Sequence, residues 1–193
     1  MLQRTNSRRS IAVLLGSVRR DRMGARAAQM VVRELEERGH EVHLVDPLDL
    51  QLPLLDRMYK EHPAGEAPAN LEKLAELYRS VDEFLVVSAE YNHGIPPALK
   101  NLLDHFLEEY FWRPSGIVCY SAGGFGGVRA AMQLRMTLAE LGMPSIPSIL
   151  PISRIAETIS DDGVASEITV RSMNRFLDEF LWYAGALADG TPY

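Results

Sequence analysis

Short apolar segments alternate with segments of helical periodicity along most of this chain, and no other feature constrains the fold as strongly. Short apolar runs bounded by turn residues are typical of buried strands, whereas apolar residues spaced three or four apart are typical of amphipathic helices. Strands joined through helices form a mostly parallel sheet, because such crossovers are right-handed. We expect strands at residues 11–15, 41–45, 84–87, 116–120 and 145–152, and helices at residues 24–38, 71–79, 98–109, 128–141 and 167–187.

Five strands favour an α/β fold with a flavodoxin-like doubly wound parallel sheet, in the order 2-1-3-4-5 with helices on both faces. In this order the loops after the first, third and fourth strands lie side by side at the carboxyl edge of the sheet. Ligands bind at that switch point in open α/β sheets. The same three loops carry the least ordinary residue patterns of the chain, so they are the first place to look for a site.

The chain is expected to form one domain at residues 11–187, between a disordered N-terminal tail at residues 1–10 and a C-terminal tail at residues 188–193. A length of 193 residues is enough to bury one substantial core. Residues 48–68 contain three prolines that interrupt any regular period. We therefore expect a long surface excursion there, of unassigned role.

Charge and residue usage exclude several classes of protein. The net charge of -6 would repel a polyanion, so extended nucleic-acid binding is not expected. The single cysteine, Cys119, cannot form an internal disulfide or hold a metal cluster, and the five histidines lack metal-ligand spacing. No apolar run is long enough to span a bilayer, and the first ten residues lack the apolar core of a signal peptide. We expect a cytoplasmic protein without a metal or a membrane segment.

The first of the three loops runs from Gly16 to Gly24 and combines a hydroxyl and several arginines with the start of a helix. Helix N-termini present N–H donors and partial positive charge, and an arginine can hold two phosphate oxygens at once. The loop lacks the Gly-Lys-Ser/Thr ending of a nucleoside-triphosphate loop, so a monophosphate such as that of FMN fits better. An ordinary turn with solvated arginines is the alternative. We assign the phosphate to Ser17, Arg19, Arg22 and Gly24, and we count Met23 of the same loop among the cofactor-binding residues.

The second loop, after the third predicted strand, is dense in Asn, Gly and Pro, which indicates a fixed turn. Backbone N–H and C=O groups of such a turn can pair with the polar edge of an isoalloxazine ring. Its Tyr91 and His93 side chains can also be ordinary packed or solvated groups, so the segment is assigned to the cofactor more than its side chains. The assigned residues are Glu90, Tyr91, Asn92, His93 and Gly94.

The third loop follows the fourth predicted strand and places four glycines in residues 121–127. Glycine lets backbone approach a ligand without an intervening Cβ atom, although a tight strand-to-helix turn alone explains one or two of the four. Arg129 and Arg135, on the helix that follows, are either dinucleotide-phosphate ligands or, as is commoner, solvated helix residues. The residues assigned to the flavin are Ser121, Ala122, Gly123 and Gly124.

Together the three loops resemble the NADPH-dependent FMN reductase family, over about residues 11–150. The resemblance implies a flavodoxin-like fold in which the first motif holds the FMN phosphate and the other two frame the isoalloxazine. Family members include flavin, quinone, azo and chromate reductases, so the resemblance implies the cofactor more firmly than the acceptor. The motifs are Gly16-Ser17-Val18-Arg19 with Arg22 and Gly24, Glu90-Tyr91-Asn92-His93-Gly94-Ile95-Pro96 with Leu99-Lys100-Asn101, and Ser121-Ala122-Gly123-Gly124.

Two departures from the family pattern leave open which donors complete the phosphate pocket. Ala89 stands where a proline commonly precedes the Glu-Tyr-Asn segment, and Met23-Gly24 stands where many members have a serine. The family is usually dimeric or tetrameric, so the resemblance implies a homodimer or homotetramer. The aromatic-rich helix end is either part of that interface or part of the protomer's own core. It comprises Phe106, Leu107, Tyr110, Phe111 and Trp112.

The function expected from these patterns is an FMN-dependent NAD(P)H oxidoreductase that passes electrons through FMN to a small acceptor. The acceptor is a free flavin, a quinone, an azo compound or a chromate-like oxidised metal, and the sequence does not choose between NADPH and NADH. Hydride transfer is chemistry of the cofactors, so no catalytic side chain is assigned. Two rivals remain: a flavodoxin-like electron carrier reduced by a partner protein, and an α/β regulatory domain without flavin.

Overall fold

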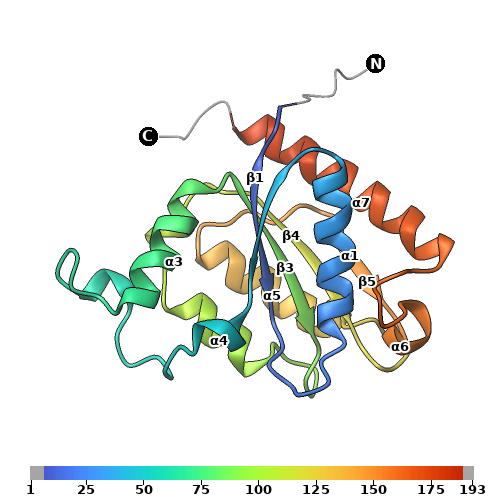
Figure 1. The fold of residues 1–193 in the computed structure, drawn as a ribbon, viewed down its shortest axis with the longest axis horizontal. Coiled ribbons are helices and arrows are strands. Elements are labelled where there is room, and N and C mark those ends of the chain that lie inside the picture. The colour runs from blue at the N-terminus through green and yellow to red at the C-terminus, as the bar shows by residue number, and fades with distance from the viewer. Residues whose placement is uncertain (1–6, 189–193) are drawn as a thin grey trace.

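The computed structural model describes residues 7–188, and its centre is a five-stranded parallel sheet in the order β2-β1-β3-β4-β5 (Figure 1). This is the order that the sequence predicts. The strands are β1 (Ser10–Leu15), β2 (Glu41–Val45), β3 (Glu83–Ala89), β4 (Ser115–Tyr120) and β5 (Leu150–Ile152). The helices are α1 (Gly24–Glu37), α2 (Pro47–Leu50), α3 (Ala69–Ser80), α4 (Pro97–Asp104), α5 (Val128–Glu140), α6 (Ile155–Thr158) and α7 (Glu167–Leu187), with 3-10 turns η1 (Tyr59–Glu61) and η2 (Glu108–Tyr110).

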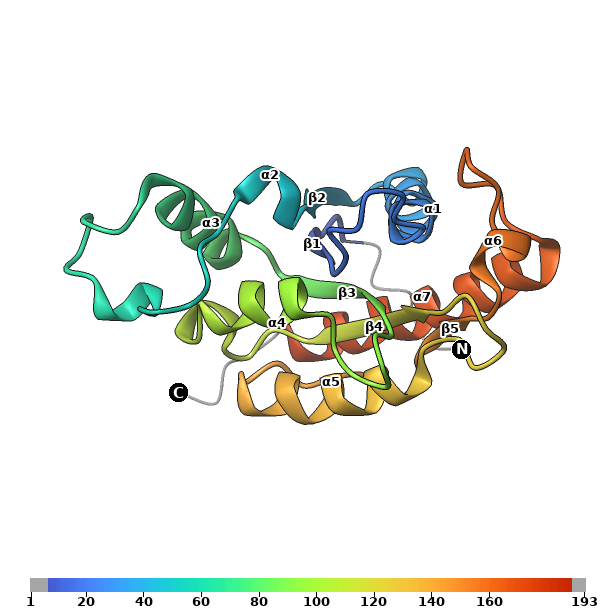
Figure 2. The ribbon, with the colours of Figure 1, turned by 90° about the horizontal axis from the view of Figure 1, so that it is seen from below.

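Helices cover both faces of the sheet, which explains why the central strands are continuously apolar (Figure 2). In β1 the alternate residues Ile11, Val13 and Leu15 face α1 and α7, whereas Ala12 and Leu14 face α3, α4 and α5. All five side chains are buried. With both faces closed, the ends of the strands are where the sheet remains open to a ligand.

The predicted helix at residues 98–109 is too long, because α4 ends at Asp104 and η2 follows. The chain leaves helical geometry at Leu107, whose φ is -148°. Phe106 and Tyr110 then pack with Tyr78 of α3 in edge-on and tilted ring contacts. These two aromatic residues therefore belong to the protomer's own core. The neighbouring Phe111 and Trp112 are 37% and 40% exposed, so the aromatic segment divides between core and surface.

Three further boundaries differ from the sequence predictions. The strand expected at residues 145–152 is reduced to β5. Pro147 lacks the backbone N–H that a ladder requires and lies outside β5, and Ser145 forms only an isolated bridge with Ser115. Residues 1–10 were expected to be a disordered tail, but β1 begins at Ser10 and Arg9 is buried. Residues 1–6 and 189–193, the remainder of the two predicted tails, lie outside the described residues. None of the described helices is long and apolar enough to cross a membrane.

Residues 48–68 form the long excursion that the sequence predicts, and their only regular elements are α2 at the start and the short turn η1. Hydrogen bonds from helices hold it in place. The Asn101 side chain of α4 donates to Pro53 O (2.8 Å) and accepts from Leu55 N (2.9 Å). Tyr59 donates its hydroxyl to Glu72 of α3 at 2.7 Å. The excursion is thus tied to both α3 and α4.

Glu83, the first residue of β3, carries a buried carboxyl group. Within residues 7–188 neither carboxyl oxygen has a hydrogen-bond partner. Burial raises the pKa of Glu83 to about 8; the charge of Arg9 opposes this shift and that of Asp82 adds to it. The folded protein therefore holds Glu83 protonated through neutral pH, whereas the unfolded chain does not.

This difference predicts how stability depends on pH. Between about pH 5 and pH 8 the folded state keeps a proton that the unfolded carboxyl has released, so the free energy of unfolding falls as pH rises. Urea unfolding at pH 6 and pH 8 is expected to show a loss of roughly 1–3 kcal/mol across this window. Glu83→Gln, which cannot ionise, should flatten that part of the profile and be the more stable protein at pH 8. Equal pH slopes for the two proteins would contradict the assignment.

Candidate cofactor site at the carboxyl edge of the sheet

The three loops singled out in the sequence meet at one edge of the sheet. They follow the adjacent strands β1, β3 and β4 (Figure 1). The Ser17 hydroxyl of the first loop lies 2.7 Å from the Tyr91 hydroxyl of the second. Tyr120, which ends β4 immediately before the third loop, places its hydroxyl against Gly24 at the start of α1. Contacts between side chains as well as strand order therefore join the loops.

Ser17, Tyr91 and Tyr120 form a cluster of hydroxyl groups beside the start of α1. Ser17 is buried, and its Oγ also accepts a hydrogen bond from Arg19 N at 3.4 Å. Burial raises the pKa of Tyr120 to about 12, against a smaller opposing effect of its hydrogen bond with Ser17. The Tyr120 hydroxyl therefore stays protonated at neutral pH. A Cβ atom on Gly24 would collide with the Tyr120 hydroxyl, which explains why glycine is needed there.

The N-terminus of α1 is suited to bind an anion. Its first turn contains no acidic residue, and the preceding Met23 makes no side-chain cap hydrogen bond. The Met23 side chain is partly buried and packs against the core on the α1 side of the sheet. Arg19 and Arg20 are exposed in the same loop. This combination fits a phosphate group.

Arg22, which was also assigned to the phosphate, is engaged by other protein groups. It forms an ion pair with Asp46, with Nη1 2.6 Å from Asp46 Oδ1, and donates to Ser17 O at 2.9 Å. Its hydrogen bond with Asp46 is the main reason that the pKa of Arg22 is raised. Asp46 also caps α2, because it accepts from Leu48 N. In this structure Arg22 holds the loop against the end of β2.

The second loop turns back on itself at Asn92 and His93, which adopt φ angles of 50° and 66°. Tyr91 and Gly94 exchange two backbone hydrogen bonds, of 3.1 and 2.9 Å, across the turn. The Asn92 and His93 side chains are exposed, and Tyr91 is partly buried. The sequence correctly indicated a fixed turn here. Its backbone, and not a catalytic side chain, is the ordered feature that it presents.

The Glu90 carboxylate points toward α5. Oε2 accepts from Arg129 N (3.0 Å) and Ala130 N (3.3 Å), and Oε1 pairs with the Arg129 guanidinium (3.3 Å). Glu90 was assigned to the cofactor, and in the structure its side chain serves as an N-terminal cap for a helix. Arg129 also covers the Phe125 ring, and Arg135 donates to Ile146 O. Both guanidinium groups are thus engaged by other protein groups, and their role as dinucleotide-phosphate ligands stays a prediction.

The four glycines of the third loop fall into two pairs. Gly126 and Gly127 have positive φ angles, of 62° and 80°, and a Cβ atom on Gly127 would lie 2.8 Å from Tyr120 O. The turn itself therefore requires this pair. Gly123 and Gly124 are exposed, have no positive φ, and would bring a Cβ within 4 Å of no atom among the described residues. The protein's own packing does not account for glycine at these two positions.

Hydrogen bonds fix the open part of this loop. Ser121 Oγ donates to Gly123 O (2.9 Å), Arg154 N donates to the same oxygen (2.9 Å), and Ser153 Oγ donates to Gly124 O (2.8 Å). Ala122 is exposed between them. The backbone is thus held from one side and bare on the other. A flat ring can approach that bare side, so the residues present fit an FMN molecule whose phosphate lies at α1.

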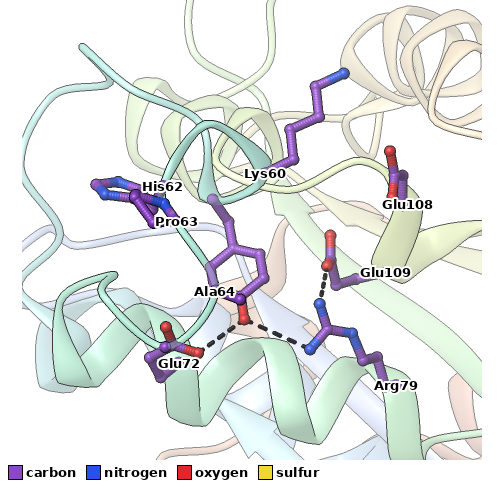
Figure 3. A pocket seen from close by; sticks show the side chains of 10 residues that line it. Lys60, His62, Pro63, Ala64, Glu72, Arg79, Glu108 and Glu109 are labelled. Atoms are coloured by element: carbon purple, nitrogen blue, oxygen red, sulfur yellow. Dashed lines mark hydrogen bonds and ion pairs between the residues drawn. The ribbon is translucent and has the colours of Figure 1, made fainter.

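A separate cavity of about 520 Å³ lies between η1, α3 and η2 and shares no residue with the three loops (Figure 3). Its wall contains the Tyr59–Glu72 hydrogen bond and an ion pair between Arg79 and the buried Glu109, 2.7 Å apart. These contacts join η1, α3 and η2 to one another, which suits a structural link. Across residues 7–188 no three His, Cys, Asp or Glu side chains gather as a metal site.

Comparison with known proteins agrees with this geometry. Residues 9–157 match the family model described as NADPH-dependent FMN reductase. The chain belongs to the NADPH-dependent FMN reductase family. It is 30% identical over 179 residues to a quinone reductase from Pseudomonas putida, an alignment that covers 89% of this chain and 92% of the relative. It is 32% identical over 185 residues to an NAD(P)H-dependent FMN reductase from Schizosaccharomyces pombe, with 88% of each chain covered.

The fold of a solved structure is also similar. The flavoenzyme NAD(P)H:(acceptor) oxidoreductase FerB from Paracoccus denitrificans superposes with a TM-score of 0.76, at 24% identity over 92% of this chain and 98% of that one. Family membership confirms the resemblance, the flavodoxin-like fold and the flavin cofactor that the sequence predicted. The assignment of individual FMN reductase site residues stays a prediction.

Sequence reasoning missed three residues that build the site. Tyr120, Asp46 and Gln133 contact the loops from β4, the end of β2 and α5 respectively. Tyr120 ends β4 and Asp46 directly follows β2, both at the carboxyl edge, and that position was a usable signal. Gln133 lies mid-helix, with nothing in its local pattern to single it out.

The two kinds of glycine in the third loop give a test. Gly123→Ala should leave the urea stability of flavin-free protein unchanged, because its Cβ meets no protein atom, but should weaken FMN binding by about 1–3 kcal/mol through overpacking. Gly127→Ala should instead lower stability by about 1–3 kcal/mol, because of its positive φ and close contacts. Both quantities come from urea titration and fluorescence titration with FMN. Full FMN affinity in Gly123→Ala would remove the third loop from the cofactor site.

Proposed function

We propose that this protein binds FMN across the three loops and uses it to carry electrons from NADPH or NADH to a small acceptor. The observation that carries the proposal is the convergence of the loops, joined by the 2.7 Å contact between Ser17 and Tyr91. The uncapped start of α1 on one side and the bare backbone at Gly123 on the other suit the two ends of one FMN molecule. Membership of the NADPH-dependent FMN reductase family supports the same conclusion.

The contacts within the loops indicate which residues would hold the phosphate and which would hold the ring of FMN. Ser17, Arg19 and the backbone at Met23 and Gly24 would hold the phosphate, while Arg22 keeps the loop in place through Asp46. The turn at residues 91–94 and the backbone of residues 121–124 would frame the ring. When bound, FMN supplies the capacity to accept hydride from a nicotinamide and pass electrons onward.

No side chain is proposed as an acid or base. Hydride transfer between nicotinamide and flavin depends on stacking and orientation, which a fixed backbone supplies. The hydroxyl cluster agrees with this, since burial holds the Tyr120 hydroxyl in its protonated form through neutral pH. We propose that donor and acceptor bind in turn, as in a ping-pong scheme. Family membership favours direct reduction by a nicotinamide over the rival role of an electron carrier reduced by a partner protein.

A quinone is the acceptor class we propose first, because relatives over nearly the whole chain are named quinone reductases. We further propose a homodimer or homotetramer in the cytoplasm, with no nucleic-acid partner. Large apolar side chains on the surface support self-association: Met132 and Met136 on α5 are 47% and 69% exposed, and Phe111 and Trp112 are also exposed. Light scattering of the purified protein measures the assembly directly.

The function itself has a simple spectroscopic test. Purified protein supplied with FMN is expected to retain the cofactor and appear yellow. Anaerobic addition of NADPH should then rapidly bleach the visible absorbance of the bound flavin. Addition of a quinone should then restore the absorbance. Retained FMN that NADPH and NADH reduce only slowly would favour the electron-carrier role, and failure to take up FMN would refute both.

The phosphate assignment predicts unequal effects of two adjacent arginines. Arg19→Ala should weaken FMN binding by about 1.5–3 kcal/mol, because it removes a charge-assisted hydrogen bond. Arg20→Ala removes the same charge from the neighbouring exposed position and serves as the matched control. Fluorescence titration at two salt concentrations separates a direct contact from general attraction. Equal losses in the two variants would show that Arg19 acts only through net charge.

A further inference from the structure

The turn at Asn92 and His93 is held in a backbone conformation that these residues do not favour by themselves. Both have positive φ angles, of 50° and 66°, and neither is glycine. Within the turn only the Tyr91–Gly94 backbone pair opposes its opening. A segment that must present a defined backbone to a ligand therefore depends on support from outside.

Gln133 of α5 supplies that support with both ends of its amide. Nε2 donates to His93 O at 3.0 Å, and Oε1 accepts from Ile95 N at 3.4 Å. Gly94 lies between these two groups, and a Cβ atom on it would be 3.4 Å from Gln133 Oε1. One side chain thus spans three consecutive residues of the turn, and its oxygen lies close against the glycine.

Glu90 makes the second connection between the same two elements. Its carboxylate accepts from two N–H groups of the first turn of α5, which has no acidic residue of its own and no side-chain cap at Gly127. The Glu90 side chain is 9% exposed, so this contact is shielded from water. Glu90 therefore attaches the beginning of the loop to α5, and Gln133 attaches the later part of the loop, at His93 and Ile95, to the same helix.

We propose that Gln133 is a positioning residue, which sets the backbone of residues 91–95 against the flavin ring without contacting the ring itself. The inference rests on the proposed function, because the ring is the group that this backbone would frame. Since α5 also follows the glycine loop directly, the clamp makes the two ring-framing loops one rigid unit. Loss of the clamp would change how the ring is held, whereas the phosphate loop before α1 would keep its own attachment through Arg22 to Asp46 and Ser17 O.

The test compares two substitutions with a matched control. Gln133→Leu removes both hydrogen bonds, and Gln133→Glu keeps the acceptor for Ile95 N but loses the donor to His93 O. Gln29→Leu makes the same chemical change on the exposed face of α1. Amide hydrogen exchange of flavin-free protein reports the clamp alone, and FMN titration with the visible spectrum of bound flavin reports positioning.

In Gln133→Leu the amides of residues 91–95 are expected to exchange about tenfold faster and the Kd for FMN to rise about tenfold, as the loss of two hydrogen bonds implies. The flavin absorption maximum should shift, Gln133→Glu should lie between, and Gln29→Leu should match the wild type. Unchanged exchange would refute the clamp. Faster exchange with unchanged Kd and spectrum would refute positioning and leave the proposed function standing, whereas wild-type protein that takes up no FMN would refute positioning and function together.

Discussion

Burial of both faces of the parallel sheet is the constraint on which the rest of this structure depends. The central strands have no solvent-facing side, since α1 and α7 cover one face and α3, α4 and α5 cover the other. Polar chemistry is consequently confined to the ends of the strands. At the carboxyl ends the sheet order places the loops after β1, β3 and β4 next to each other, and their hydroxyl, glycine and backbone groups converge without help from a second domain.

The loops at that edge are fastened by different means. The phosphate-side loop is held by ionic contacts, with Arg22 joined to Asp46 and to the carbonyl of Ser17. The ring-side loop is fastened to α5 by Glu90 and Gln133. Hydroxyl contacts connect the two sides, through Ser17 with Tyr91 and through Tyr120 with Ser17 and Gly24. Because the two loops are fastened separately, variants in one fastening report mainly on the part of the cofactor that this loop would hold.

The sheet, its strand order and the three loops followed from the sequence, because apolar periodicity and glycine placement are local signals. Helix ends and side-chain roles that depend on residues distant in the sequence could not be predicted in this way. The helix predicted through residue 109 ends at Asp104 because Phe106 and Tyr110 join Tyr78 in a ring cluster, which no window of sequence reveals. Likewise Arg22 resembled a free phosphate ligand until its pairing with Asp46, 24 residues away, was visible.

The role of the Glu90 side chain also could not be predicted from its position in the sequence. Its position in a motif indicated a ligand contact, whereas its carboxylate serves α5. Among the glycines, the sequence could not tell Gly126 and Gly127, which the turn requires, from Gly123 and Gly124, which it does not. Backbone angles and the distance to Tyr120 O separate them, and these depend on how the chain packs and not on composition.

Cys119 immediately precedes Tyr120, the last residue of β4, and is fully buried. Burial raises the pKa of this thiol to about 12, and the nearby Glu90 charge adds to the shift. Only the thiolate attacks disulfides, peroxides and alkylating agents at an appreciable rate. Quinones, the acceptor class proposed for this protein, react with thiols. Because the Cys119 thiol is buried and stays protonated, it is protected from such an acceptor.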